Sequence, residues 1–290
     1  MVDGVLVVDK PRGPTSHDVV AKARRALGTK AVGHAGTLDP MATGVLVLAI
    51  GEATKLVPYL SASDKEYEAT VALGLATDTL DAEGRETARA DLPARWRDAL
   101  DAALEAERAR TMQLPPIFSA IHAKGARSHE RARRGEAVEL EERPVRVAAL
   151  EAIATAEAEI RLRLTVSKGY YVRALARDLA ARLGTVGHLT ALRRVRSGAF
   201  SLSEAIPLAE LGPASPVVPL AAAAARVLPT CTLTEAGAAH ARAGRAVPLA
   251  DLGTTAEGEH AWLGPGGELV AVGRVESGQG RVTRGFTARS

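Results

Sequence analysis

The residues best suited to chemistry lie in one stretch of the chain, 33–44, which contains a carboxylate, an imidazole and two hydroxyls. These groups belong to Asp39, His34, Thr37 and Thr43. Three glycines allow this backbone to adopt turns that side chains would forbid. The apolar run 45–50 follows directly and predicts a buried strand, so the loop is braced in the way that binding and catalytic groups often are. A second interpretation stays open, because Asp followed by Pro is also a common turn pair.

Positive charge is concentrated in a second stretch, 167–203. The whole chain has a net charge of +3, whereas this stretch alone has +6. Its ionised residues are Lys168, Arg173, Arg177, Asp178, Arg182, Arg193, Arg194 and Arg196. A local concentration of this kind indicates a polyanionic partner, and a solvated helix face is the alternative interpretation.

Composition excludes several classes of protein. With 290 residues, 47% of them hydrophobic and 24% charged, the chain is expected to form a main globular domain with a small appendix. Cys231 is the single cysteine, so no internal disulfide is possible and a cytoplasmic location is expected. No segment has the pattern of a membrane span or a signal peptide. Scattered histidines and one cysteine give no zinc-type spacing, so no metal is predicted.

Hydrophobic periodicity predicts the elements that must position these groups. Thr15 or Ser16 can cap a first helix, which Gly28 ends. Further helices are expected at 52–60, 92–110, 128–134 and 172–183. Strands are expected at 5–8, 45–50, 65–71, 115–121, 160–166 and 192–196. The loop 77–84 resembles half a calcium loop, but its first and twelfth ligand positions carry the wrong residues, so an acidic surface loop is predicted.

The C-terminal part differs in composition. Prolines and an alanine run over 205–228 predict a connecting segment with little sheet. Residues 229–290 predict a β-rich unit with a helix at 235–243 and a strand at 268–275. That unit holds six basic and six acidic residues, so bulk charge cannot supply an affinity for RNA.

Two short matches to other motifs are rejected. Gly33 and Gly36 match the clamp of KH domains, but that clamp lies between two helices, whereas this pair precedes a strand. Residues 168–170 begin like a strand motif of RRM domains, yet they lead into a helix. No phosphate-binding or dinucleotide-binding glycine motif is present, so nucleotide hydrolysis and hydride transfer lose their support.

Eight segments in matching order and spacing resemble one family, the TruB-type tRNA pseudouridine synthases, over residues 4–200. The segments are DKPRGPTSHD (9–18), GHAGTLDPMATG (33–44), GEATK (51–55), DKEY (64–67), TDT (77–79), PPIFSA (115–120), SKGYYVR (167–173) and LRR (192–194). Members isomerise the uridine at position 55 in the T loop of tRNA. The resemblance departs at His122, where lysine is usual, and at Ser128-His129, where an aromatic residue is usual.

The resemblance implies an α+β fold, with a mixed, mostly antiparallel central sheet flanked by helices and a small β-rich C-terminal domain. The implied domains are a catalytic domain at 1–228 and a PUA-like RNA-binding domain at 229–290. An insertion at about 113–147 would grip the RNA like a thumb. The two departures fall in that insertion and concern RNA contacts rather than the chemistry.

The resemblance also implies the roles of the site residues. Asp39 would be the catalytic carboxylate and Arg173 its ion-pair partner, although charge alone fits a phosphate contact for Arg173 equally well. Tyr67 would stack on the flipped uracil, and Tyr171 and Leu192 would line the pocket; without the resemblance all three are core residues. His34 would stack in the vacated RNA loop, instead of being a solvated loop residue.

The remaining roles concern support and RNA binding. Lys10 and Pro11 would support the catalytic loop, and Lys168, Arg193 and Arg194 would contact phosphates, which position RNA without reading its sequence. The expected partner is the T stem-loop of tRNA, for a monomer that needs no cofactor and no protein partner. Two alternatives stay open: a guide-RNA-dependent pseudouridine synthase, and a non-catalytic protein that binds or folds tRNA.

Overall fold

The computed structural model describes residues 3–118, 122–123, 126–127 and 140–287. Contacts divide the chain into two compact units. The first unit comprises Met1–Asp39, Val45–Ser63 and Ser197–Ser290, and the second comprises Pro40–Gly44 and Asp64–Arg196. The chain therefore leaves the first unit directly after Asp39. The predicted boundary at 228/229 is a different division and stays a prediction.

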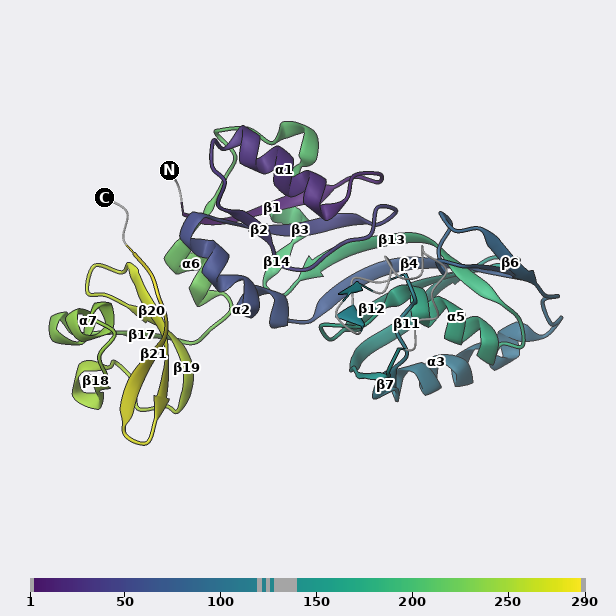
Figure 1. The fold of residues 1–290 in the computed structure, drawn as a ribbon. Coiled ribbons are helices and arrows are strands. Elements are labelled where there is room, and N and C mark those ends of the chain that lie inside the picture. The colour runs from purple at the N-terminus through teal and green to yellow at the C-terminus, as the bar shows by residue number, and fades with distance from the viewer. Residues whose placement is uncertain (1–2, 119–121, 124–125, 128–139, 288–290) are drawn as a thin grey trace. The chain divides into compact units, whose positions relative to one another are not determined.

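The first unit contains a mixed sheet covered by helix α1 (Ser16–Ala26). Its strands are β1 (Gly4–Lys10), β2 (Val32–His34), β3 (Thr43–Ile50), β15 (Ile206–Pro207) and β16 (Val218–Pro219). β1 lies beside β3, pairs in parallel with β15 and antiparallel with β16, and β2 pairs antiparallel with β3 (Figure 1). The predicted strands at 5–8 and 45–50 are confirmed, and both are buried.

Helix α1 shows why the sequence begins a helix at this point. Thr15 is its N-cap and forms a capping box, in which its hydroxyl accepts from the Asp18 N–H and the Asp18 carboxylate accepts from the Thr15 N–H. Gly28 follows the C-cap with φ +63°, a conformation that few other residues adopt. The cap is therefore Thr15, and the Ser16 hydroxyl can form hydrogen bonds elsewhere.

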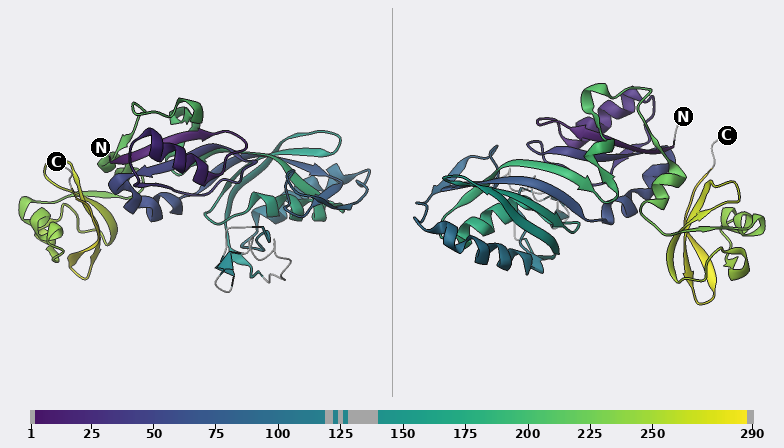
Figure 2. Two further views of the ribbon diagram at one scale, coloured as in Figure 1. Left: turned by 45° about the horizontal axis from the view of Figure 1, so that its top comes forward. Right: turned by 180° about the vertical axis from the view of Figure 1, so that it is seen from behind.

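The second unit contains a sheet in the order β11–β12–β4–β13. These strands are β4 (Lys65–Leu73), β11 (Val147–Thr155), β12 (Glu159–Val166) and β13 (Gly187–Ser197). β12 pairs antiparallel with both β11 and β4. Helix α3 (Leu100–Arg108) packs against β11 and helix α5 (Val172–Arg182) against β4 (Figure 2). Burial alternates along β4 and β12, which confirms the predicted two-residue period, and these strands supply the mixed, mainly antiparallel sheet of the predicted fold class.

Several predicted elements differ from the structure. Residues 92–95 are not helical; the helix starts as a 3-10 turn at Trp96–Ala99, where Trp96 supplies the first buried anchor, and continues as α3. Residues 115–118 form no strand, because two prolines lack the N–H groups that a ladder needs. Residues 119–121 and the predicted helix at 128–134 lie outside the described residues.

Other bounds shift without changing the element type. The expected helix at 52–60 is a 3-10 helix, η1 (Gly51–Leu56), followed by α2 (Val57–Ala62). The basic strand expected at 192–196 is the end of the longer β13. The alanine run of the connecting segment forms helix α6 (Leu220–Ala225), and this segment also supplies the short strands β15 and β16. Among the described helices, none has the length and apolar character needed to cross a bilayer.

The C-terminal part forms a five-stranded sheet in the order β17–β19–β20–β21–β18. Its elements are β17 (Thr230–Thr232), α7 (Glu235–Arg242), β18 (Val247–Pro248), β19 (Gly258–Leu263), β20 (Leu269–Glu276) and β21 (Gln279–Gly285). It has its own apolar cluster around Trp262. A second cluster joins Leu269, Val272 and Phe286 to Val47, Ala53 and Leu56, so this sheet shares a core with η1 and β3.

A polar contact fixes the end of β21 to η1. The Glu52 carboxylate accepts from the Thr287 N–H at 2.9 Å and from the Lys55 ammonium at 2.6 Å. Lys55 also donates to the Gly285 carbonyl, and its ammonium lies 5.5 Å from the centre of the Phe286 ring. Burial raises the pKa of the Glu52 carboxyl, but the hydrogen bonds from Lys55 and Thr287 outweigh burial and lower its pKa overall.

We expect Glu52→Gln to lower the free energy of unfolding by about 1–3 kcal/mol at pH 7, because hydrogen bonds to an ionised acceptor are lost. The lowered pKa means that this stabilisation is complete above the ordinary pKa of 4.5 and is lost as the pH falls through the folded-state pKa. Urea unfolding at pH 7 and pH 3.5 measures both values. The exposed Glu276, changed to Gln, is the control, and an equal loss in both variants would contradict the prediction.

Candidate active site

The backbone next to Asp39 is fixed by a buried hydroxyl. The Ser16 side chain is 1% exposed; its Oγ donates to the Leu38 carbonyl at 3.0 Å and accepts from the Leu38 N–H at 2.8 Å. Both polar backbone groups of Leu38 are thereby satisfied, and its side chain is buried. Asp39 follows directly, is half-buried, and precedes a turn at Pro40-Met41. The turn preference and the catalytic interpretation of Asp39 are both compatible with this geometry.

Glycine is required where this loop enters β3. Gly44 has φ +99°, and a Cβ atom built there would lie 2.2 Å from the Arg194 carbonyl oxygen. Within the second unit, Thr43 and Gly44 pair in parallel with Arg193 and Arg194 of β13. A side chain at residue 44 would push these two strands apart, so this glycine allows the loop to end in a paired strand.

The other predicted residues of the first unit lie on β1 and β2. Lys10 ends β1, is fully buried, and donates from Nζ to the Pro11 carbonyl at 2.9 Å, while Pro11 is exposed. His34 ends β2, is half-buried, and contacts His17 edge to face, with ring centres 5.4 Å apart. The sequence interpretation had given His17 no role.

Tyr67 lies on the buried face of β4. Lys65 and Ala69 share this face, and Leu164 of β12 is the register partner of Tyr67. Burial lowers the pKa of the Lys65 ammonium to about 8, and repulsion from Arg194 and Lys168 acts in the same direction, against attraction from Asp64. Lys65 was missed by the sequence interpretation; its position two residues before Tyr67 in a two-residue period is the signal that it shares the buried face.

Arg173 is held on three sides by groups of the second unit. It is 6% exposed; its Nη1 donates to the Thr79 carbonyl and its Nη2 to the Phe118 carbonyl, each at 2.9 Å. Its Nε lies 3.7 Å from the Asp81 carboxylate. A buried guanidinium with these acceptors has a fixed direction, which a phosphate-binding arginine at the surface lacks.

Asp81 corrects the prediction for the loop 77–84. That loop was expected to be an acidic surface loop, but Asp81 and Thr77 are buried, whereas Asp78 and Glu83 are exposed. The Asp81 Oδ1 accepts from the Thr79 hydroxyl and from the Glu83 N–H, which closes a local turn and directs Oδ2 toward Arg173. Charge composition alone cannot separate this inward carboxylate from its exposed neighbours.

Tyr171 lies at the start of α5, and Leu192 lies in β13. Tyr171 is half-buried and is the N-cap of α5, where its backbone N–H and carbonyl form hydrogen bonds with the side chain of Gln113. Leu192 is buried, and its carbonyl accepts from the Thr43 hydroxyl. Gln113 is a second residue that the sequence interpretation missed, although it stands two positions before Pro115, where the matching segment 115–120 begins.

The three residues predicted to contact phosphate differ in exposure. Lys168 is exposed, and Arg193 is half-buried with a hydrogen bond to the Thr43 hydroxyl. Arg194 is buried, with 1% of its surface exposed, and its phosphate contact stays a prediction. The roles of Lys168 and Arg193 as phosphate contacts likewise stay predictions. Among the described residues, no three His, Cys, Asp or Glu side chains gather in a way that could hold a metal ion.

Fold comparison defines the class of protein first. The chain superposes on a chain of a solved Cbf5-Nop10-Gar1 complex with a TM-score of 0.74 and 26% identity, over 98% of this chain and 84% of that one. A chain of an archaeal box H/ACA sRNP Nop10-Cbf5 complex gives a TM-score of 0.71 at 25% identity, over 98% and 86%. The chain thus has the fold of a pseudouridine synthase.

Sequence comparison then gives the family. Residues 24–172 match the TruB family pseudouridylate synthase N-terminal domain, and residues 173–217 match the tRNA pseudouridylate synthase B C-terminal domain. The chain is also similar to individual relatives. The tRNA pseudouridine synthase B of Thermobifida fusca is 47% identical over 81% of this chain and 83% of that protein. The protein of the same name from Corynebacterium efficiens is 42% identical over 99% and 96%. The chain belongs to the TruB family of pseudouridylate synthases.

We expect Ser16→Ala to loosen the backbone beside Asp39. Removing the hydroxyl leaves the N–H and carbonyl of Leu38 without these bonds, so the free energy of unfolding should fall by about 1–3 kcal/mol. Hydrogen exchange of the Leu38 amide should quicken in the folded protein. The neighbouring Thr15→Ala, which removes only the cap of α1, is the control. Unchanged exchange at Leu38 in Ser16→Ala would show that the hydroxyl does not fix this loop.

Proposed function

We propose that this protein isomerises uridine to pseudouridine at position 55 in the T loop of tRNA, with Asp39 as the catalytic carboxylate. The observation that carries the proposal is the half-buried carboxylate of Asp39, which directly follows a residue whose backbone Ser16 fixes. Membership of the TruB family and relatives named tRNA pseudouridine synthase B support the choice of tRNA. The T stem-loop as binding partner and a monomeric enzyme belong to the same proposal.

The reaction breaks the bond from ribose C1′ to uracil N1, turns the base, and forms a bond from C1′ to C5, after which the proton on C5 is lost and N1 is protonated. It is redox-neutral. The target base must leave its stack, at a cost of a few kcal/mol. Stacking of the extruded uracil on Tyr67 would return about 1–3 kcal/mol. The ion pair of Arg173 with Asp39 stays a prediction from the resemblance, as do the pocket roles of Tyr171, Leu192 and His34.

The buried acceptors around Arg173 favour catalysis over simple binding. A side chain that only attracts phosphate gains most when it is exposed and mobile, whereas Arg173 is buried and bonded to two carbonyls. The guide-RNA-dependent alternative is less favoured, because identity to the matched chain of the Cbf5-Nop10-Gar1 complex is 26%, against 42–48% to the tRNA pseudouridine synthase B relatives. Purified protein acting on bare tRNA transcript, followed by mapping of pseudouridine, separates the three functions.

We expect Asp39→Asn to abolish product formation while folding and tRNA binding stay near those of the wild type. The carboxylate is the reacting group, so turnover should fall by at least about 10³-fold. Single-turnover assays with saturating tRNA, filter binding and thermal unfolding measure the three properties. The exposed Asp91, changed to Asn, is the matched control. Appreciable turnover by Asp39→Asn would refute the catalytic assignment.

We expect neutralising Lys168 and Arg193 to flatten the salt dependence of tRNA binding. Each lost phosphate contact should reduce the slope of log K against log salt by about 0.7–0.9, because fewer counterions are released. Lys168→Gln, Arg193→Gln and the double variant are compared between about 50 and 200 mM salt. The exposed Arg95, changed to Gln, controls for charge alone. An unchanged slope in the double variant would place the phosphate contacts elsewhere.

A further inference from the structure

Gln113 is a buried amide at the root of the predicted RNA-gripping insertion. It lies in β7 (Met112–Gln113), which pairs antiparallel with β10 (Arg143–Pro144), so these two short strands bracket the insertion. The side chain is 1% exposed. An uncharged amide at such a depth must find partners for its donor and its acceptor, or it costs stability.

Both partners are the backbone of one residue, Tyr171. The Gln113 Nε2 donates to the Tyr171 carbonyl at 3.1 Å, and its Oε1 accepts from the Tyr171 N–H at 2.8 Å. Tyr171 is the N-cap of α5, has extended backbone angles, and makes no side-chain capping bond. Its carbonyl also accepts from the N–H groups of Ala174 and Leu175, so the first turn of α5 starts from the position that Gln113 sets.

The segment after Gln113 contacts α5 at two more points. Arg177 donates to the Leu114 carbonyl at 3.2 Å, and Arg173, one turn earlier on α5, donates to the Phe118 carbonyl. Between these points Pro115 and Pro116 are buried and restrict the backbone. The segment therefore lies along the N-terminal half of α5 as a stiff strip.

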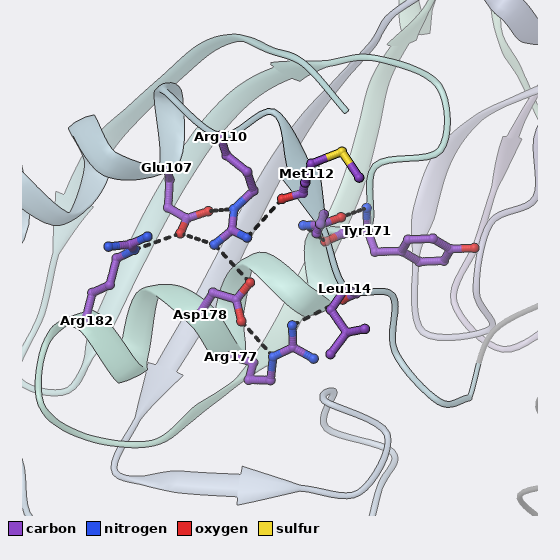
Figure 3. A network of polar contacts seen from close by, with 9 residues as sticks. Glu107, Arg110, Met112, Leu114, Tyr171, Arg177, Asp178 and Arg182 are labelled. Carbon is purple, nitrogen blue, oxygen red and sulfur yellow. Dashed lines mark hydrogen bonds and ion pairs between the residues drawn. The ribbon is translucent and has the colours of Figure 1, made fainter. Parts of the chain in front are cut away.

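An ion network fixes the other side of this strip. Arg110 forms ion pairs with Glu107, which is fully buried, and with Asp178 at 3.0 Å, and it donates to the Met112 carbonyl (Figure 3). Asp178 also pairs with Arg177 at 2.7 Å. One polar network thus connects the end of α3, the strip and α5. Gln113 is the residue of the strip that bonds directly to Tyr171.

We propose that Gln113 is a positioning residue for the reaction: its amide fixes the backbone of Tyr171, and through the start of α5 it sets the directions of the Tyr171 and Arg173 side chains. This deepens the proposed function and rests on it. The amide acts as a neighbouring strand would, offering one donor and one acceptor to a single residue. Because Gln113 also belongs to the root of the insertion, the same contact ties that root to the pocket residues.

The test compares Gln113→Met, which removes both bonds, with Gln113→Glu, whose carboxylate keeps the acceptor and loses the donor. Thr185→Val is the matched control, since it removes another buried bond from a side chain to a backbone carbonyl in the same unit. Gln113→Met should lower the single-turnover rate at saturating tRNA on the order of 10²-fold. Its Kd for tRNA should stay within about threefold of the wild type, and amide exchange at Tyr171 should quicken. Gln113→Glu should lose rate because a carboxylate oxygen then faces the Tyr171 carbonyl oxygen in place of a donor, while keeping slower exchange at Tyr171 than Gln113→Met.

Two outcomes overturn the proposal. One is a single-turnover rate within threefold of the wild type for Gln113→Met. The other is a loss of rate that Thr185→Val reproduces at an equal loss of melting temperature, which would make the effect one of stability. Exchange at Tyr171 needs no substrate, so it tests the contact even if the wild type forms no pseudouridine, an outcome that would refute the proposed function instead.

Discussion

The structure depends on buried side chains that take the place of a neighbouring strand. Ser16 bonds both polar backbone groups of Leu38, and Gln113 bonds both polar backbone groups of Tyr171. A functional loop is usually irregular and cannot satisfy its own N–H and carbonyl groups when it is partly buried. One hydroxyl or one amide satisfies both backbone groups. Because that side chain is itself fixed, it also restricts the backbone of the residue it bonds, which is Tyr171, or of the residue that follows, which is Asp39.

Regular elements could be predicted from the sequence because their signals are local. The alternation along β4 and β12, the apolar runs of β1 and β3, and the Thr15 cap with Gly28 are each visible within a dozen residues. Errors fell where a local signal competes with backbone chemistry or packing. Pro115 and Pro116 stand in an apolar stretch but cannot donate to a ladder, and residues 92–95 precede the first buried anchor, Trp96.

The candidate site was predicted from the sequence only where one residue carries a recognisable role. Asp39, Tyr67 and Arg173 could be named from the resemblance, whereas their supports could not. Asp81 is inward because the turn that it forms with Thr79 and Glu83 directs it to Arg173. Gln113 reaches a residue 58 positions away in the chain. Arg193 and Arg194 carry the same charge and are neighbours in β13, yet Arg194 is buried and Arg193 is only half-buried. In these cases the tertiary structure, rather than the residue type, decides whether the side chain is buried and what it contacts.

Buried cations give the clearest physical argument for chemistry over binding alone. Arg173, Arg194 and Lys65 all have exposures of 6% or less in the second unit, and burying a charge costs several kcal/mol before any partner offsets it. The cost is visible at Lys65, where burial lowers the pKa to about 8. A protein selected only to attract RNA would place such charges at the surface, where counterion release supplies the affinity. Charges kept inside have fixed positions, and fixed charge is the arrangement on which electrostatic catalysis depends.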